Sequence, residues 1–356
     1  MQFYFLYLIN QLINMKQMRE NFHIKIRAEQ RQKEFAKRRI IKLQATPQYF
    51  RQAVLENPIS ELLKEIDQPD YLQFISFLSS VEDYQCNKYM VDQGVLKVAF
   101  EKTIQLMNNY TQTSTQEVSL NYLLSIIGNF IDFINFPDDK LRFIIQRAIE
   151  ISNNSMTEFK LTIIWLIDEF LKKEQFQEDF LSSVTNFLFN NLGRRDIASA
   201  IFDTILNLQS SQPVQLSKEH LDELYKHIGD NDNQIVQKSL FILVNYLDIM
   251  DQIDIDEEVI ILLNEIFRYK DYLALLKLSN ILYPRIQLEP KLILQRMEVC
   301  AFGLKLQEYF SLINKLIKDE ILSTAEYLKS LQNIEMENQC ENNKSMILQQ
   351  ITQYQD

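Results

Sequence analysis

Five stretches of this chain carry the same apolar pattern at nearly constant spacing. They are 120-LNYLLSIIGNFIDF, 160-KLTIIWLIDEFLKK, 198-ASAIFDTILNLQ, 237-QKSLFILVNYLD and 271-DYLALLKLSNILY. When Asn129, Glu169, Asn207, Asn245 and Asn280 are taken as equivalent, the intervals are 40, 38, 38 and 35 residues. Within each stretch apolar residues recur every three or four positions, which is typical of α-helices. The spacing therefore predicts helical layers that bury their apolar faces against one another.

The few, widely spaced glycines also favour a helical fold without a nucleotide-binding loop. The chain has five glycines, and no two lie closer than the 34 positions between Gly94 and Gly128. Walker-type and Rossmann-type loops need several clustered glycines to approach a phosphate, so both are excluded. Apolar residues make up 46% of the chain and are spread along its whole length, which supplies a continuous core. We see no strand-rich region.

A period near forty residues is typical of armadillo and HEAT units, in which each layer contains two or three helices. The stretch 87-NKYMVDQGVLKVAFEKT resembles an armadillo segment in which one helix ends near a glycine and the next begins with an apolar run. We predict an all-α fold, an armadillo/HEAT-type α-α superhelix (a right-handed solenoid) of six to eight repeats over residues 45–331. Residues 332–356 are predicted to form a terminal cap or a flexible tail.

Membrane and disulfide chemistry are not indicated. The apolar opening, residues 1–15, is too short to span a bilayer, lacks a cleavage site, and is interpreted as a possible misassigned start. Cys86, Cys300 and Cys340 are far apart and odd in number, which fits reduced thiols. We expect a protein of the cytoplasm and nucleus with no membrane partner.

Charge is divided unequally along the chain. Residues 16–42 hold ten basic and three acidic residues, a net charge of +7, so the remainder carries −18. An acidic body repels a phosphate backbone, and we therefore expect no nucleic-acid partner. The basic segment is predicted to be a helix that docks in an acidic groove, and a solvated charged helix or a frayed arm is the alternative.

The order of residues in that segment resembles the importin-β-binding segment of the importin-α family. In NFHIKIRAEQRQKEFAKRRII, Ile26-Arg27 match the family's Leu-Arg pair, Arg31 a basic position, and Lys37-Arg38-Arg39 the closing Lys-Arg-Arg. The resemblance implies that Arg27, Arg31, Lys37, Arg38 and Arg39 within residues 16–44 bind importin-β. It also implies that the Lys-Arg-Arg run competes for the chain's own cargo groove.

The same family holds basic nuclear-localisation-signal cargo with a Trp and, four residues later, an Asn on successive inner helices. The resemblance places the cargo groove at Asn129, Trp165, Asp168, Glu169, Asn207, Asn245 and Asn280. The residues four before the Asn positions are Ser125, Asp203, Phe241 and Leu276, and Trp165 is the single tryptophan, so the ladder is eroded. Three interpretations stay open: a peptide clamp, ordinary structural amides with a core tryptophan, and a divergent adaptor with changed cargo.

Catalytic chemistry finds little support in the sequence. His23, His220 and His227 are the three histidines, and none has a metal-ligand spacing such as HExxH. We predict no enzyme activity, no catalytic or metal site and no cofactor. The leading expectation is an importin-α-like nuclear import adaptor that docks on importin-β, and the alternative is an armadillo or HEAT scaffold for another protein partner.

Overall fold

The computed structural model describes residues 46–135, 139–250, 255–299, 304–319, 321–323 and 326. The predicted importin-β-binding residues, with the rest of segments 1–15 and 16–44, lie outside the described residues, as does the tail 332–356. The chain divides into two compact units, residues 1–174 and 175–356. This division falls inside the body that the sequence predicts as one solenoid, residues 45–331.

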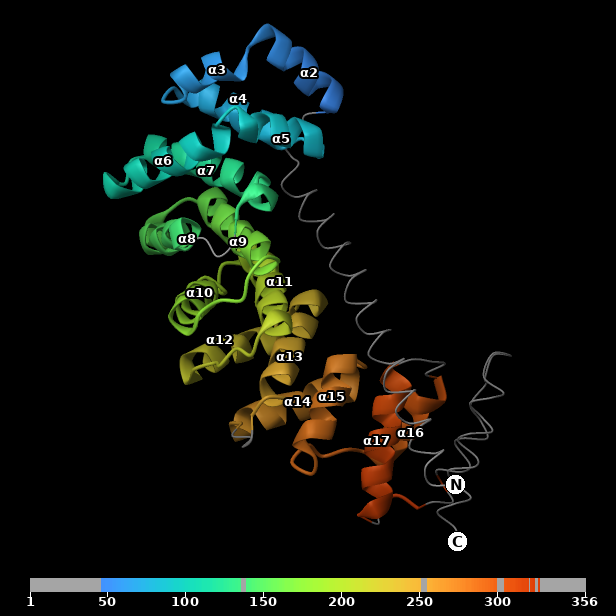
Figure 1. The fold of residues 1–356 in the computed structure, drawn as a ribbon. Helices are drawn as coiled ribbons and strands as arrows, with labels where there is room; N and C mark the ends of the chain where they lie inside the picture. Colours follow the sequence, from blue (N-terminus) through green and yellow to red (C-terminus); the bar gives the residue numbers. More distant parts are fainter. Residues whose placement is uncertain are drawn as a thin grey trace. The chain divides into compact units, whose positions relative to one another are not determined.

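The first unit is helical throughout its described part (Figure 1). Its α-helices are α2 (Pro47–Glu56), α3 (Ile59–Leu62), α4 (Pro69–Ser79), α5 (Tyr84–Asp92), α6 (Val95–Asn108), α7 (Ser114–Asn129), α8 (Asp139–Ile151) and α9 (Thr157–Leu171). Short 3₁₀ turns η1 (Leu63–Glu65), η2 (Ile131–Phe133) and η3 (Ser152–Asn154) join some of them.

The second unit repeats this construction. Its α-helices are α10 (Glu178–Asn190), α11 (Arg195–Ser211), α12 (Lys218–Ile228), α13 (Asn233–Leu247), α14 (Glu257–Tyr269), α15 (Leu273–Leu282), α16 (Pro290–Val299) and α17 (Leu304–Lys318). No strand occurs among the described residues of either unit, so the predicted all-α fold is confirmed.

Each unit is a stack of helix layers. In the first unit α7 packs against both α4 and α9, and in the second unit α11, α13, α15 and α17 pack successively on one another. We call these seven the stacking helices. The intervening helices α6, α8, α10, α12 and α16 each pack on the stacking helix that follows them in the chain. This is the neighbour-on-neighbour packing of an α-helical repeat solenoid, as the sequence predicts.

Helix boundaries follow local chemistry. Pro47, Pro69 and Pro290 are the first residues of α2, α4 and α16, where a missing N–H carries no penalty. Gly94 has a φ of +87° between α5 and α6, a left-handed conformation that glycine adopts without a Cβ penalty. The glycine-marked helix junction predicted around residues 87–103 is therefore confirmed.

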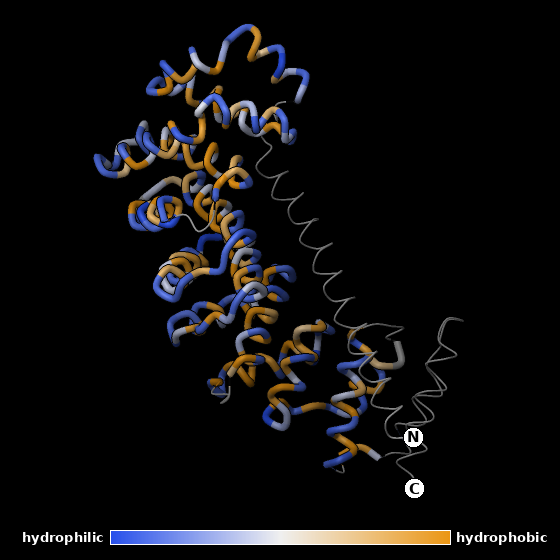
Figure 2. The backbone as a smooth tube through the Cα atoms, in the orientation of Figure 1, coloured by the Kyte–Doolittle hydropathy of each residue, from blue (hydrophilic) through white to orange (hydrophobic). Residues whose placement is uncertain are grey.

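The core lies between the layers. Leu123, Ile126 and Ile127 of α7 are at most 1% exposed, as are their counterparts one repeat later on α9. The burial pattern of residues 121–130 is reproduced position by position by residues 161–170, an offset of 40. Figure 2 shows that most helices carry both apolar and polar residues along their length. Each helix buries one face and leaves the other for contacts.

Candidate protein-binding face of the stacking helices

A row of half-exposed side chains follows the stacking helices. Spacing of about four residues keeps these side chains on one side of each helix, opposite the buried stripe. In the first unit they are Tyr122, Ser125 and Asn129 on α7, and Leu161, Trp165 and Glu169 on α9. In the second unit they are Asn207 on α11, Phe241 and Asn245 on α13, and Lys277 and Asn280 on α15. The five positions that the sequence took as equivalent, Asn129, Glu169, Asn207, Asn245 and Asn280, are all half-exposed. Of the positions four residues before them, Ser125, Trp165 and Phe241 are half-exposed, but Asp203 and Leu276 are buried.

Trp165 lies in the contact between two layers. A Cβ built on Gly128 of α7 would come within 2.0 Å of two atoms of the Trp165 ring, so the indole rests directly on the glycine backbone. The ring remains half-exposed. One part of the ring therefore fixes α9 against α7, and the other part is accessible to a partner.

Three of the four predicted asparagine clamps already donate hydrogen bonds within the chain. Asn129 Nδ2 donates to Ser79 Oγ of α4 at 2.8 Å, and Asn245 Nδ2 donates to Gln209 Oε1 of α11 at 3.3 Å. Asn280 Nδ2 donates to Glu308 Oε2 of α17 at 2.9 Å. These three amides connect α7 to α4, α13 to α11 and α15 to α17. A peptide would have to share or replace these bonds to use the same donors.

Carboxylates on this face are largely neutralised by lysines of the chain itself. Lys173 Nζ lies 2.5 Å from an oxygen of Asp132, Lys172 Nζ 2.7 Å from Glu169, and Lys238 Nζ 2.9 Å from Asp203. Asp168, which the sequence also places in the groove, is only 8% exposed, as is Asp203. The face therefore presents little uncompensated negative charge for a lysine-rich ligand.

The structure shifts the register at α15. Leu276, which the sequence alignment placed on the groove, is 1% exposed and belongs to the core. Its neighbour Lys277 is the half-exposed side chain instead. Counting back four residues from Asn280 therefore reaches the core, and counting back three reaches the half-exposed side.

Polar networks between layers are the part of the site that sequence reasoning missed. Asn233 Oδ1, at the start of α13, accepts hydrogen bonds from Tyr272 Oη at 2.7 Å and Lys270 Nζ at 3.2 Å. Asp271 Oδ1, just before α15, accepts from Tyr309 Oη of α17 at 2.6 Å. Each pair is separated by 37 to 39 residues, about one repeat. Polar residues separated by one repeat were therefore the feature of the sequence that could have predicted these hydrogen bonds.

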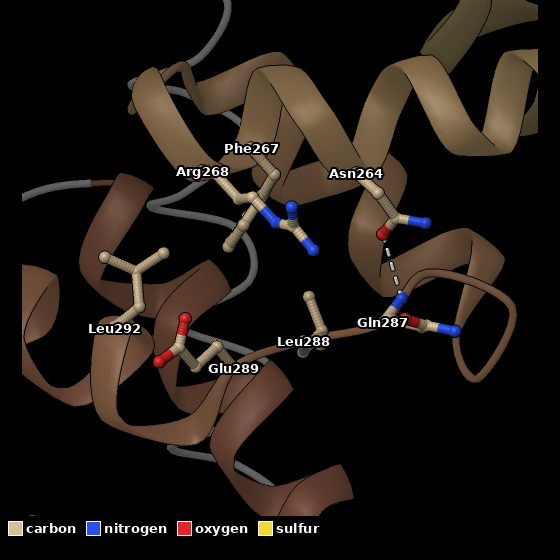
Figure 3. A pocket seen from close by; sticks show the side chains of 7 residues that line it. All are labelled: Asn264, Phe267, Arg268, Gln287, Leu288, Glu289 and Leu292. Carbon is tan, nitrogen blue, oxygen red and sulfur yellow. Dashed lines mark hydrogen bonds between the residues drawn. The ribbon is translucent and has the colours of Figure 1, made fainter.

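A shallow pocket lies beside α14, at the start of α16 (Figure 3). It is lined by Asn264, Phe267, Arg268, Gln287, Leu288, Glu289 and Leu292. Asn264 Oδ1 accepts a hydrogen bond from the Gln287 N–H at 2.9 Å, which ties the loop to the helix. The lining contains no histidine, cysteine or serine, so it offers neither a nucleophile nor a neutral-pH base.

Reactive and metal-binding groups do not gather elsewhere in the described ranges. Burial raises the pKa of the Cys86 thiol to about 11, with a further contribution from Asp83, so this thiol is protonated at neutral pH. No cluster of His, Cys, Asp and Glu suited to a metal ion occurs among the described residues. In those same ranges, no helix has both the length and the apolar character that crossing a bilayer requires.

Comparison with known proteins adds little to this geometry. No protein-family model matches the chain, and no curated protein sequence matches it. Solved structures do match, among them two crystal structures described as engineered proteins of the Northeast Structural Genomics Consortium. One has a TM-score of 0.47 and 10% identity, covering 76% of this chain and 81% of its own. The other has a TM-score of 0.37 and 11% identity, covering 74% of this chain and 97% of its own.

Proposed function

We propose that this chain is a protein-binding scaffold that holds an extended segment of a partner along the half-exposed face of its stacking helices. The observation that carries the proposal is the recurrence of one exposed row at equivalent depth in successive layers of each unit. Packed helices lie about 8–10 Å apart, and an extended peptide rises about 3.3 Å per residue. One layer therefore matches about three peptide residues, which lets a regular row of side chains follow a peptide.

The chemistry of the row favours backbone and aromatic contacts. Amides such as Asn129 and Asn245 offer a carbonyl oxygen and an N–H₂ group, which are the groups that an unpaired peptide backbone needs. Tyr122, Trp165 and Phe241 offer ring faces for apolar or cationic side chains. Because Glu169 and Asp203 are paired with lysines, net charge contributes less than these contacts.

Peptides selected for binding to the full chain from a random library should test this face. We expect selected peptides that bind the first unit to change the fluorescence of Trp165, the single tryptophan. Asn129→Ala, which removes the amide, should weaken those peptides about tenfold. Lys64→Ala is the matched control, because its exposed ion pair with Glu61 lies outside the row. Selected peptides that bind with unchanged affinity to Asn129→Ala and leave the Trp165 signal unaltered would contradict the proposal.

A more specific form of this function is an importin-α-like nuclear import adaptor. The order of basic residues between Arg27 and Arg39 favours it. In this form importin-β binds residues 16–44, so that their Lys-Arg-Arg run leaves the cargo groove of the chain. A basic nuclear-localisation signal of a cargo protein then binds in that groove. Such a chain would work in both cytoplasm and nucleus. The lysine pairs on the carboxylates of the face imply that its cargo is less lysine-dependent than the family resemblance alone implies.

Binding of a synthetic peptide covering residues 16–42 to purified importin-β tests the adaptor form. We expect binding that weakens steeply with salt, because charge pairs dominate it. Replacing Arg38 and Arg39 by Ala should weaken it at least tenfold, and replacing Gln30 and Gln32 by Ala should not. An unmodified peptide that fails to bind importin-β would eliminate the adaptor form and leave the scaffold proposal standing.

A further inference from the structure

Two histidines of helix α12 contact neighbouring helices of the second unit. His220 lies three residues into the helix, where its ring stacks on Phe189 of α10 with centroids 4.6 Å apart. Its Nε2 lies 2.9 Å from Asn186 Oδ1, also on α10. His227, two turns further on, packs edge-to-face on Phe202 of α11 at 5.4 Å. Both rings therefore connect α12 to its neighbours.

The hydrogen bonds of His220 require a neutral ring. Its Nδ1 accepts a hydrogen bond from the Ser217 N–H at 3.2 Å, while Ser217 Oγ accepts from the His220 N–H at 3.3 Å. This reciprocal capping box satisfies two N–H groups at the start of α12. With Nδ1 as acceptor, Nε2 carries the proton and donates to Asn186. A second proton on Nδ1 would face the Ser217 N–H and break the cap.

The surroundings of His227 also disfavour a charged ring. Its side chain is 12% exposed, and its Nε2 is buried without a hydrogen-bond partner among the described residues. Carboxylate oxygens of Glu223 and Asp230 lie 3.9 Å away, beyond hydrogen-bonding distance. Protonation would place a charge against Phe202 in a largely buried position, where the two carboxylates attract the ring but Nε2 has no direct hydrogen bond.

We propose that α12 is an acid-sensitive element of the second unit, and that protonation of His220 and His227 loosens it from α10 and α11. The capping box, the two ring contacts and the buried nitrogen carry this inference independently of the proposed binding function. Protonation of the two histidines would link a drop in pH to local opening of the layer that contains α12, while the other layers stay folded.

The charged groups around the two rings do not reverse this preference. Glu219 acts on His220, and Glu223 and Asp230 act on His227, all favouring the protonated ring, while Lys226 opposes it. The rings contact three uncharged residues of α10 and α11, which are Asn186, Phe189 and Phe202. Helix α13 also packs on α12, and it adds no charged group that acts on either ring. Burial is the larger effect and lowers the pKa of both histidines below 6.5.

The direction of the pH effect follows from these lowered pKa values. Between the folded pKa and the unfolded value of 6.5, the unfolded state binds more protons than the folded state. Stability of the α12 contacts is therefore fully present above 6.5 and is lost as the pH falls from 6.5 toward the folded pKa.

Hydrogen exchange of the full chain, measured at pH 7.5 and 5.5 and corrected for intrinsic rates, tests the proposal. We expect peptides from α12 to lose protection at pH 5.5, by up to about tenfold for each histidine, because pH 5.5 lies one unit below the unfolded value of 6.5. Peptides from α9 serve as the internal reference, because the described part of the first unit contains no histidine.

Two variants separate histidine protonation from other acid effects. His220→Gln keeps an acceptor that a capping box uses naturally but cannot be protonated, and His227→Phe keeps an aromatic contact with Phe202. The double variant should retain α12 protection at pH 5.5, and His220→Gln alone should retain a part of it if the double variant does not fold. Equal loss of protection in the wild type and in His220→Gln, or no loss in the wild type, would overturn the proposal.

Discussion

Replacing Gly128 by Ala is expected to destabilise the first unit by about 2 kcal/mol, the usual size of an overpacking effect. An added methyl group would meet the Trp165 ring at 2.0 Å, so either α7 or the indole has to move. This result would be opposite to the usual gain of about 1 kcal/mol when Ala replaces Gly inside a helix. Urea unfolding followed by Trp165 fluorescence measures the change in the free energy of unfolding, with a probe that lies at the altered contact.

Gly229→Ala provides the matched control. No atom lies within 4 Å of a Cβ built at Gly229, so we expect a change within about 0.5 kcal/mol when unfolding is followed by circular dichroism. Combining Gly128→Ala with Trp165→Leu should reduce the penalty of the alanine, because the smaller side chain makes room for the methyl group. Both backgrounds are compared by circular dichroism, because Trp165→Leu removes the single tryptophan. If Gly128→Ala costs the same in both backgrounds, the ring is not what requires the glycine.

Replacing Lys238 by Met should destabilise the second unit by about 3 kcal/mol, as expected when one member of a buried ion pair is removed. Lys238 Nζ lies 2.9 Å from both Asp203 Oδ2 and Ser199 Oγ, and Asp203 is 8% exposed. Methionine would leave that carboxylate buried without its counter-charge. Urea unfolding followed by circular dichroism measures the loss.

Lys64→Met is the comparison for the ion pair. Lys64 and Glu61 are 65% and 61% exposed, so breaking their pair should change stability by less than about 0.5 kcal/mol. Asp203→Asn combined with Lys238→Met should recover much of the lost stability, because no uncompensated charge remains. Equal effects of Lys238→Met and Lys64→Met would show that the Asp203 pair is not effectively buried.

Much of the fold is predictable because helices depend on near neighbours in the chain. Apolar spacing at three and four residues identified α7, α9, α11, α13 and α15, and the interval near forty identified their stacking. Proline and glycine at helix ends located boundaries such as those beside Pro69 and Gly94. These signals depend on residues that are close together in the chain, so they can be read from the sequence.

The candidate site was predictable only in part. Asn129, Asn245 and Asn280 lie half-exposed on stacking helices, and the sequence did not reveal that their amides join adjacent layers. The partners Ser79, Gln209 and Glu308 lie 28 to 50 residues away. No local pattern marks such partners.

The sequence by itself determined that this chain folds as stacked helical layers, because burial of one face per helix is encoded in short-range periodicity. Tertiary structure alone decided which polar side chains stay available to a partner. That choice depends on how far each helix turns and slides against the next, as the exchange of Leu276 for Lys277 at the surface shows. A rotation of one residue, about 100°, moves a side chain from solvent into the core.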